Sequence, residues 1–544
     1  MNKNTSKNLI LQGSFLVASQ MIVRAINLLY RIPVTNLWGD KGLGIYSDAY
    51  QVYSFFLIFA SISIPTVISK MVSERLATGR DKDADRVLTC GLLLIGGIGF
   101  LSMLIMILGG HALAIILYDN PEATRPMQYL GPTVLVCSVM SVLRGYFQGM
   151  NDMKPTAISE VIEGFLHAVF SVALAFMLDP MGLEWSVTGG IIGTGIGAVG
   201  SLVFLLVCFY LVRKRIKADV TAAGVTAADV TAAGPAEAQP AATESAQAIL
   251  RQMIHLMIPI VLSSTIFTVK SMIDSTLFGK LMQYQQHDPE AIIAMRGVYN
   301  GKFVVIVNLP VAVGEALGSA SVPSIASARA LGRRDEMVNH METMIRTVLL
   351  ITVPCAVGIA LLGKPVLRLL FPTSFIGGEL FWVGFGAVVF YSLSYVAGGV
   401  LNGLNRPELS MQHCAIGVVI TSILNVVCIL ILHLGIFTFA VNTTIFSLFI
   451  MITNMKSAEQ LCEVKIPFVK LAKGPIICSL LMGALCFVSY LFLFSIFGSN
   501  AIAAIGSIGI GVIAYFLLMV NLNFVTPEDE ENIPGGRFLE YLRI

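Results

Sequence analysis

The chain has 544 residues, of which 12% are Asp, Glu, Lys or Arg and 56% are hydrophobic. Soluble domains carry roughly 25% charged residues, and single cores stop growing near ~250–300 residues. The composition therefore excludes a cytosolic enzyme, a disordered protein and a disulfide scaffold. It predicts an all-α integral membrane protein with many spans. The net charge of +2 gives no basic excess for binding nucleic acid. The nine cysteines fall singly and without metal-ligand spacing, so we expect no metal and no cofactor.

Apolar runs of about 20 residues predict 14 transmembrane helices. In chain order the runs are 9–34, 44–72, 86–109, 127–149, 155–178, 186–212, 252–278, 296–325, 343–362, 379–403, 408–432, 436–456, 472–497 and 499–521. These runs divide the chain into a six-helix lobe over 1–212, a second six-helix lobe over 251–458, two additional helices within 459–521 and a tail over 522–544.

Residues 213–250 interrupt the apolar pattern. The heptad that runs from Ala218 to Gly224 recurs from Ala228 to Gly234, and a stretch rich in Ala, Pro, Glu and Gln follows. A segment with so few large apolar residues buries too little surface to offset the entropy of ordering. We predict a flexible cytoplasmic linker between the two lobes, with an Ala-rich helix as the alternative.

Lys and Arg residues gather in one set of alternate loops, whereas the other set holds few, among them Lys41 and Arg296. Cytoplasmic loops carry this excess of positive charge. The bias predicts a multi-pass protein of the bacterial cytoplasmic membrane with both termini in the cytoplasm.

The two lobes resemble each other. Tyr46 and Tyr299, and also Gly79 and Gly332, are related by nearly the same offset as two similar heptads that begin at Gly145 and Gly399. Six helices return the chain to the same side, so the repeats are parallel, as in transporters that carry substrate between halves. The heptad glycines have the spacing of close helix packing or of hinges: Gly145, Gly149, Gly399 and Gly403.

Ionisable residues inside spans are candidates for function because each costs several kcal/mol, about 2.5–3.5 on insertion scales, unless it meets a cavity or a partner. The candidates for substrate binding lie in the first, second, seventh and eighth spans: Arg24, Asn27, Arg31, Asp48, Lys270, Asp274 and Lys302. We expect the cationic members to hold a diphosphate, since Arg contacts phosphate bidentately and Lys contacts it as a point charge. The alternative is that three of these cations have a structural role. In that case they snorkel, or pair with Asp48, Asp274 or Glu315, and the cations concerned are Arg31, Lys270 and Lys302.

The fifth span carries Glu160, Glu163 and His167 on one helix face. With Glu315 in the eighth span, they are candidates for gating or for binding a coupling cation or proton. Because the two acids lie in the first turns, helix capping and an ion pair with Arg144 or Lys154 form the simpler interpretation.

The segment from Arg144 to Glu160 is similar to the one that joins the fourth and fifth helices in stage V sporulation protein B-like proteins. The Asn308-Leu-Pro310 and Ser321-Val-Pro323 motifs and the start of the second span from Gly44 also resemble this family. The family includes the polysaccharide exporters and lipid II flippases of the multidrug/oligosaccharidyl-lipid/polysaccharide (MOP) superfamily. The resemblance implies a MATE-like fold and a flippase of undecaprenyl-diphosphate-linked wall precursors or oligosaccharides.

Two other functions compete with this one. A cation-coupled drug antiporter of the same fold needs acids in its cavity, and the charges chosen above are too balanced to separate it from a flippase. A membrane-embedded glycosyltransferase or polymerase needs large outer loops with catalytic carboxylates, and the longest outer loop, 279–295, offers only Asp288 and Glu290. The sequence lacks a Walker A motif and an ordered Ser/His/Asp set. We therefore expect a transporter rather than an enzyme.

Overall fold

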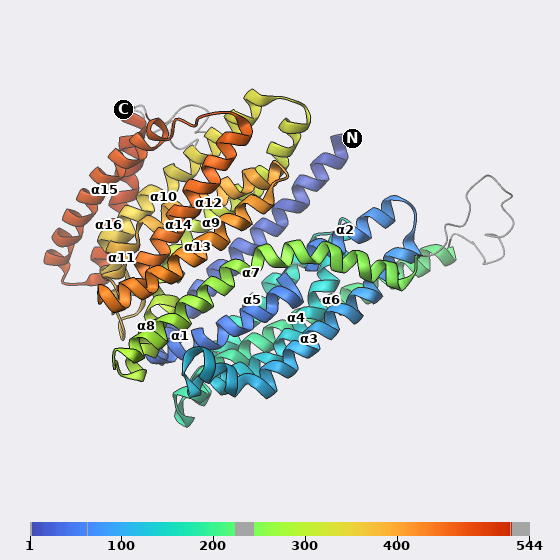
Figure 1. Cartoon of the computed structure of the whole chain (residues 1–544), viewed down its shortest axis with the longest axis horizontal. Coiled ribbons are helices and arrows are strands. Elements are labelled where there is room, and N and C mark those ends of the chain that lie inside the picture. Colours follow the sequence, from blue (N-terminus) through green and yellow to red (C-terminus); the bar gives the residue numbers. More distant parts are fainter. Residues whose placement is uncertain (1–2, 63, 223–243, 523, 525–544) are drawn as a thin grey trace. The chain divides into compact units, whose positions relative to one another are not determined.

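The computed structural model describes residues 3–62, 64–222, 244–522 and 524, and within these the regular elements are all helices (Figure 1). Short 3-10 and π-helical segments, η1 to η5, join or extend some of them. The α-helices are α1 (Lys3–Leu57), α2 (Ile64–Ala77), α3 (Asp81–Tyr118), α4 (Thr124–Gly149), α5 (Lys154–Leu178), α6 (Leu183–Ala222), α7 (Ala246–Tyr284), α8 (Pro289–Val298), α9 (Val304–Ala330), α10 (Arg334–Leu370), α11 (Leu380–Gly384), α12 (Gly386–Gly403), α13 (Pro407–Val426), α14 (Phe437–Cys462), α15 (Phe468–Phe497) and α16 (Asn500–Asn521).

Twelve helical stretches of the described residues are long and apolar enough to cross a membrane, or thirteen when the bent pair Ala246–Leu262 and Thr265–Tyr284 is counted as a span. The first stretch, Ser19–Ala77, contains the second predicted span and residues 19–34 of the first. It is broken at Gly39, where φ is 63° and ψ is −166°. Glycine adopts this backbone conformation without the steric penalty that a side chain brings.

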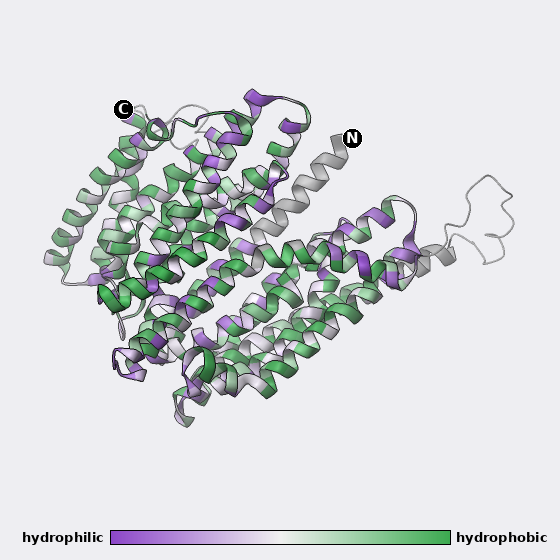
Figure 2. Ribbon diagram, in the orientation of Figure 1, coloured by the Kyte–Doolittle hydropathy of each residue, from purple (hydrophilic) through white to green (hydrophobic). Residues whose placement is uncertain are grey.

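The surface of these helices is apolar, as a lipid environment requires. Figure 2 shows hydrophobic residues along the helices and hydrophilic residues mostly at their ends and turns. Leu108 of α3 and Val469 of α15 are 80% and 82% exposed. Water would disfavour such large apolar surfaces, whereas lipid chains accommodate them. The predicted all-α membrane fold is confirmed.

Each predicted span coincides with one or more described helices, and the main differences lie beside the predicted linker. Helix α6 continues to Ala222, and α7 begins at Ala246, so both helices extend into 213–250. Residues 223–243 of that linker, and nearly all of the tail over 522–544, lie outside the described residues.

The chain divides into two compact units. Unit 1 comprises Met1–Trp38 and Asp48–Met272, and unit 2 comprises Gly39–Ser47 and Ile273–Ile544. The predicted lobes differ from these units because the segment Gly39–Ser47 packs with unit 2 and the first two thirds of α7 pack with unit 1. The domain limits proposed from the sequence stay a prediction.

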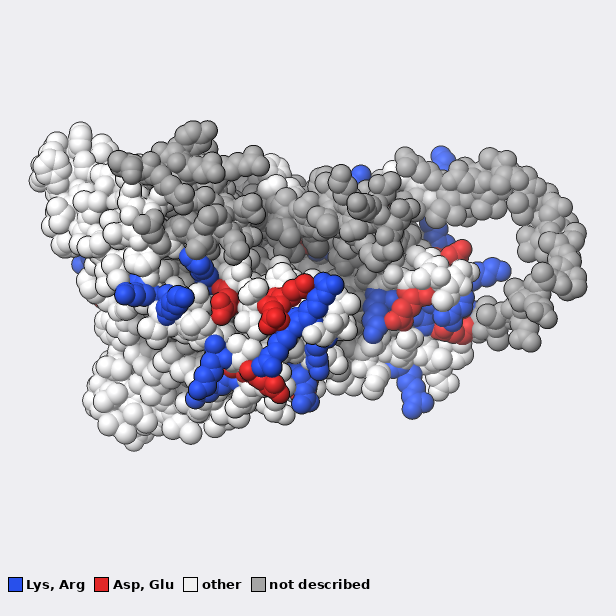
Figure 3. Space-filling model, turned by 90° about the horizontal axis from the view of Figure 1, so that it is seen from above, with Lys and Arg blue, Asp and Glu red and all other residues white. Residues whose placement is uncertain are grey.

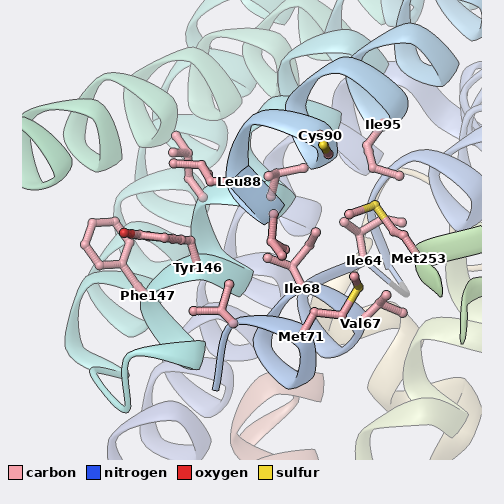
Figure 4. Packing of buried hydrophobic residues seen from close by; sticks show 14 of the residues in the cluster. Ile64, Val67, Ile68, Met71, Leu88, Cys90, Ile95, Tyr146, Phe147 and Met253 are labelled. Atoms are coloured by element: carbon pink, nitrogen blue, oxygen red, sulfur yellow. The ribbon is translucent and has the colours of Figure 1, made fainter. Parts of the chain in front are cut away.

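Unit 1 is held by close glycine contacts and by an apolar core. A Cβ atom added to Gly145 of α4 would lie 2.7 Å from the Cβ atom of Ile68 on α2, and one added to Gly193 of α6 would lie 2.3 Å from the backbone N of Ser171 on α5. Figure 4 shows Ile64, Ile68 and Met253 in the core that α2, α3, α4 and α7 share.

Unit 2 repeats this use of glycine. A Cβ atom added to Gly399 of α12 would lie 2.1 Å from the carbonyl O of Gly318 on α9, and one added to Gly403 would lie 2.8 Å from the Cβ atom of Ile325. Each heptad also ends in an Asn with positive φ, 59° at Asn151 and 55° at Asn405. The matched heptads of the sequence therefore have matched geometry: the fourth predicted span packs on the second, and the tenth packs on the eighth.

Replacement of Gly145 by Leu is expected to destabilise unit 1 by about 1–3 kcal/mol, because the new side chain has to displace the backbone of Pro65 as well as Ile68. Gly96→Leu on α3 is the matched control, since a Cβ atom there meets nothing within 4 Å. Thermal unfolding of the purified variants in detergent measures the difference. Equal unfolding temperatures for the two variants would contradict the packing role.

Candidate functional site

The candidates of the first span share a helix face but differ in exposure. Arg24 and Asn27 are exposed, whereas the side chain of Arg31 is almost fully buried. Beside them the ring of Tyr30 lies 4.6 Å from that of His167 on α5. The cationic face that the sequence predicted thus starts at an exposed guanidinium and ends inside unit 1, next to the predicted coupling residues.

The two acids of α5 have described partners. Glu163 accepts a hydrogen bond of 2.8 Å from Nη2 of Arg144 on α4, and the same guanidinium donates to the hydroxyls of Ser159 and Ser201. Glu160 accepts a bond of 2.9 Å from the hydroxyl of Ser19 on α1. Glu163 therefore forms one of the ion pairs that the simpler interpretation expected.

Buried aspartates in both units accept hydrogen bonds from asparagine amides. In unit 1, Asp48 is fully buried and accepts a bond of 2.9 Å from Nδ2 of Asn120. In unit 2, Asp274 accepts a bond of 2.8 Å from Nδ2 of Asn425, which lies on α13. Each asparagine amide thus satisfies one oxygen of a buried carboxyl group.

Lys302 is fully buried at the π-helical segment between α8 and α9. Its Nζ atom lies 2.5 Å from Oδ1 of Asp40 and donates to both the hydroxyl and the carbonyl oxygen of Ser374. An ammonium group has three donors, so these contacts use the whole hydrogen-bonding capacity of Lys302. The sequence analysis names Asp48, Asp274 and Glu315 as possible partners of the cations. In the structure, Lys302 pairs with Asp40.

The segment Gly39–Ser47 is fastened to α8 by more than this ion pair. A Cβ atom added to Gly297 would lie 2.0 Å from the carbonyl O of Asp40, and one added to Gly44 would lie 2.1 Å from the carbonyl O of Ile293. Lys41 pairs with Glu290 at 2.9 Å. The backbones approach so closely that only glycine fits at these two positions.

Unit 2 also holds several buried polar atoms on α13 and α14. Thr438 and Asn442 lie one turn apart on α14, and the ring of Phe439 between them lies 4.3 Å from that of Phe278, one turn after Asp274 on α7. In the described part of the chain, Oδ1 of Asn425, Oγ1 of Thr438 and both amide atoms of Asn442 are buried without a hydrogen-bond partner. Buried polar atoms of this kind point to a bound ion or water.

Two further sequence candidates are Lys270, one turn before Asp274 on α7, and Glu315 on α9. Lys270 is buried in the part of α7 that belongs to unit 1, and Glu315 is exposed on α9. A chamber shared by the two repeats stays a prediction. The described residues contain no group of three or more His, Cys, Asp or Glu side chains arranged for a metal.

The search for ionisable residues inside spans missed several buried groups. The loop charges place Arg296 in an outer loop, but its side chain is fully buried in α8 and packs on Gly279. Asp40 also falls between two predicted spans. Three buried asparagines carry no charge and so do not stand out among ionisable residues: Asn120, Asn425 and Asn442. For Asn425 and Asn442, the available signal was an uncharged amide inside a long apolar run.

Comparison with known proteins shows which families and structures this chain resembles. Residues 10–329 match the family described as "Polysaccharide biosynthesis protein". The chain is 26% identical over 436 residues to the lipid II flippase MurJ of Bacillus subtilis (strain 168), and the aligned region covers 77% of each chain. It is 26% identical over 205 residues to stage V sporulation protein B of the same organism. This aligned region covers 38% of this chain and 40% of the sporulation protein.

Two solved structures share the fold. One is the inward-facing conformation of a multidrug resistance MATE family transporter of the MOP superfamily, with a TM-score of 0.65 at 14% identity over 84% of this chain and 98% of that one. The other is the lipid II flippase MurJ in an inward closed conformation, with a TM-score of 0.64 at 14% identity over 92% of this chain and 97% of that one. The fold is therefore that of MATE and MurJ transporters.

Proposed function

The chain belongs to the polysaccharide biosynthesis protein family, and from this membership we propose that it flips a lipid-linked wall precursor across the bacterial cytoplasmic membrane. The proposed substrate is lipid II or a related undecaprenyl-diphosphate-linked oligosaccharide, carried from the cytoplasmic to the outer leaflet by alternating access. The observation that carries the proposal is the similarity to the lipid II flippase of Bacillus subtilis over 77% of both chains. We propose that both termini face the cytoplasm, as the loop charges predict.

The fold alone does not select between flippase and drug antiporter, because structures of both kinds match with nearly equal TM-scores. The sequence relatives favour the flippase. Buried cations support it as well, since Arg31, Lys270 and Lys302 suit a diphosphate better than a cationic drug. We propose that these residues, with exposed Arg24 and Asn27, bind the diphosphate at successive stages of transport.

We also propose that a monovalent cation binds at Asp274, Asn425, Thr438 and Asn442. Hard cations take carboxylate, amide and hydroxyl oxygens. One carboxylate among neutral oxygens balances a single positive charge, which avoids an uncompensated buried charge. Energy stored in a sodium gradient would then couple to the movement of α7, the helix that carries Asp274.

Sodium is expected to stabilise the purified protein by about 2.7 kcal/mol at a concentration near 100 Kd, and Asp274→Asn is expected to remove this effect. Thermal unfolding in NaCl against choline chloride at equal ionic strength measures it. Asp48→Asn is the matched control, because Asp48 is also buried and also bonded to an asparagine. The same sodium response in wild type and Asp274→Asn would reject the cation site.

Reconstitution in liposomes tests the transport function. Vesicles containing the protein receive fluorescent lipid II in one assay and ethidium in another, with protein-free vesicles as the blank. We expect lipid II to move between leaflets and ethidium to stay outside. Transport of ethidium without movement of lipid II would reject the flippase function in favour of the drug antiporter. The appearance of polymerised glycan would indicate a membrane-embedded glycan polymerase instead.

A further inference from the structure

Three arginines gather at the corner where α2 turns into α3. Arg75 lies in the last turn of α2 and is 2% exposed. Arg80 lies in the turn between the helices, and Arg86 lies on the first turns of α3. We call these residues the arginine corner. All three donate hydrogen bonds to one residue, Glu244, which lies two residues before the start of α7.

Glu244 uses all of its polar atoms in this contact. One carboxylate oxygen accepts from Nη2 of Arg75 and the other accepts from Nη1 of Arg80 at 2.6 Å. Its carbonyl oxygen accepts from Arg86 at 2.8 Å, and its backbone N donates to Asp83 at 3.3 Å. Burial raises the pKa of Glu244, but the hydrogen bonds and charges of Arg75 and Arg80 outweigh burial and hold the pKa below its ordinary value. At neutral pH the corner therefore contains a carboxylate.

The corner has the composition of a phosphate site rather than of a simple ion pair. Guanidinium groups bind carboxylates and phosphates through the same paired donors. The three guanidinium groups converge on a single residue, Glu244, rather than each pairing with an acid of its own. In the described structure Nε of Arg75 is buried without a hydrogen-bond partner, which leaves one donor for a ligand with more acceptor oxygens.

The residue that fills the corner is attached to a helix that belongs to both units. Ser245 caps α7 through its hydroxyl, and Ile249 and Met253 are buried in the core of unit 1 (Figure 4). The same helix passes into unit 2 after Met272. A movement of the start of α7 would displace Glu244, which lies two residues before this helix.

We propose that the arginine corner is an anion-binding site for a phosphate-bearing headgroup, and that Glu244 is its built-in competitor. In the described state Glu244 closes the site. When the start of α7 withdraws, the corner binds phosphate oxygens and delays the return of Glu244. Figure 3 shows positive and negative side chains gathered in groups on one face of the molecule. The predicted orientation places the corner at the cytoplasmic leaflet, whose lipids are anionic.

The test measures binding of pyrophosphate to the full chain in phosphatidylcholine nanodiscs by calorimetry. Glu244→Gln removes the competing charge, and we expect it to bind pyrophosphate about tenfold more tightly than wild type. Glu336→Gln is the matched control, because Glu336 also pairs with an arginine but lies on α10 of unit 2. Equal affinity in wild type and Glu244→Gln would overturn the proposal.

Removal of the arginines gives the reverse test. Arg80→Gln and Arg86→Gln, each placed in the Glu244→Gln background, should lose the gain, whereas Arg333→Gln should keep it. If the Glu244→Gln protein does not fold, Arg86→Gln alone decides, because its only described bond to Glu244 is to the backbone. That variant should bind pyrophosphate about tenfold more weakly than wild type, and unchanged binding would reject the site.

Nanodiscs that also contain phosphatidylglycerol distinguish the two sources of the phosphate. If a lipid headgroup occupies the corner, phosphatidylglycerol weakens pyrophosphate binding to Glu244→Gln. If binding is unaffected, the ligand is a soluble phosphate compound or the headgroup of the transported lipid. Both results support the site. Since the measurement involves no transport, its failure leaves the proposed flippase function untouched.

Discussion

Replacement of Arg24 by Ala is expected to abolish lipid II flipping in reconstituted vesicles while the protein still inserts and folds. Arg24 is exposed, so its removal leaves no buried cavity. A bidentate contact to a diphosphate consists of two charge-assisted hydrogen bonds of about 1.5–3 kcal/mol each, and the loss of both reduces the rate roughly 100-fold or more. Dithionite quenching of fluorescent lipid II measures the rate.

Two further variants separate the role of Arg24 from a general effect of charge. Arg24→Lys keeps the charge but loses the planar fork, so we expect an intermediate rate. Arg334→Ala removes an exposed arginine of α10 that pairs with Glu463, and we expect the wild-type rate. If Arg24→Ala supports growth of cells depleted of their own wall-precursor flippase as well as wild type does, Arg24 has no part in substrate binding.

The spans were predictable because a helix in lipid leaves a long apolar run in the sequence. The repeat was also visible, since the contacts of Gly145 with α2 and of Gly399 with α9 both require glycine at one position. The sequence predicts a loop between residues 34 and 44, and the structure instead has helix on both sides of a kink at Gly39. This continuity was hidden, because a helix that continues across a kink has the same composition as two helices joined by a loop.

The site was predictable only where charge marks it. Arg31 and Lys302 are cations inside apolar runs and were selected for that reason. Their partners depend on tertiary packing: Asp40 is distant from Lys302 in sequence, and the glycine contacts of α8 bring them together. Asn442 is uncharged, so it does not stand out within its apolar run. It is noticed only in the structure, because both of its amide atoms are buried without a hydrogen-bond partner among the described residues.

Removal of one partner of the Asp40–Lys302 pair is expected to destabilise unit 2 by about 3–5 kcal/mol, because the other partner keeps a buried, uncompensated charge. Lys302→Met and Asp40→Asn should each have this effect. The double variant should be more stable than the sum of the two losses predicts, by up to about 3 kcal/mol. Thermal unfolding in detergent, followed by tryptophan fluorescence, measures the cycle. Additive losses would mean that Ser374 alone holds Lys302.

The neighbouring pair provides the control within the same segment. Lys41 and Glu290 are 27% and 69% exposed, so Lys41→Met or Glu290→Gln should change stability by no more than about 1 kcal/mol. The double variant of Asp40 and Lys302 also separates stability from transport. If it folds well and does not flip lipid II, Lys302 acts on the substrate after Asp40 releases it. If it folds well and flips at the wild-type rate, the pair serves the fold, and the diphosphate is bound by the remaining cations of the spans.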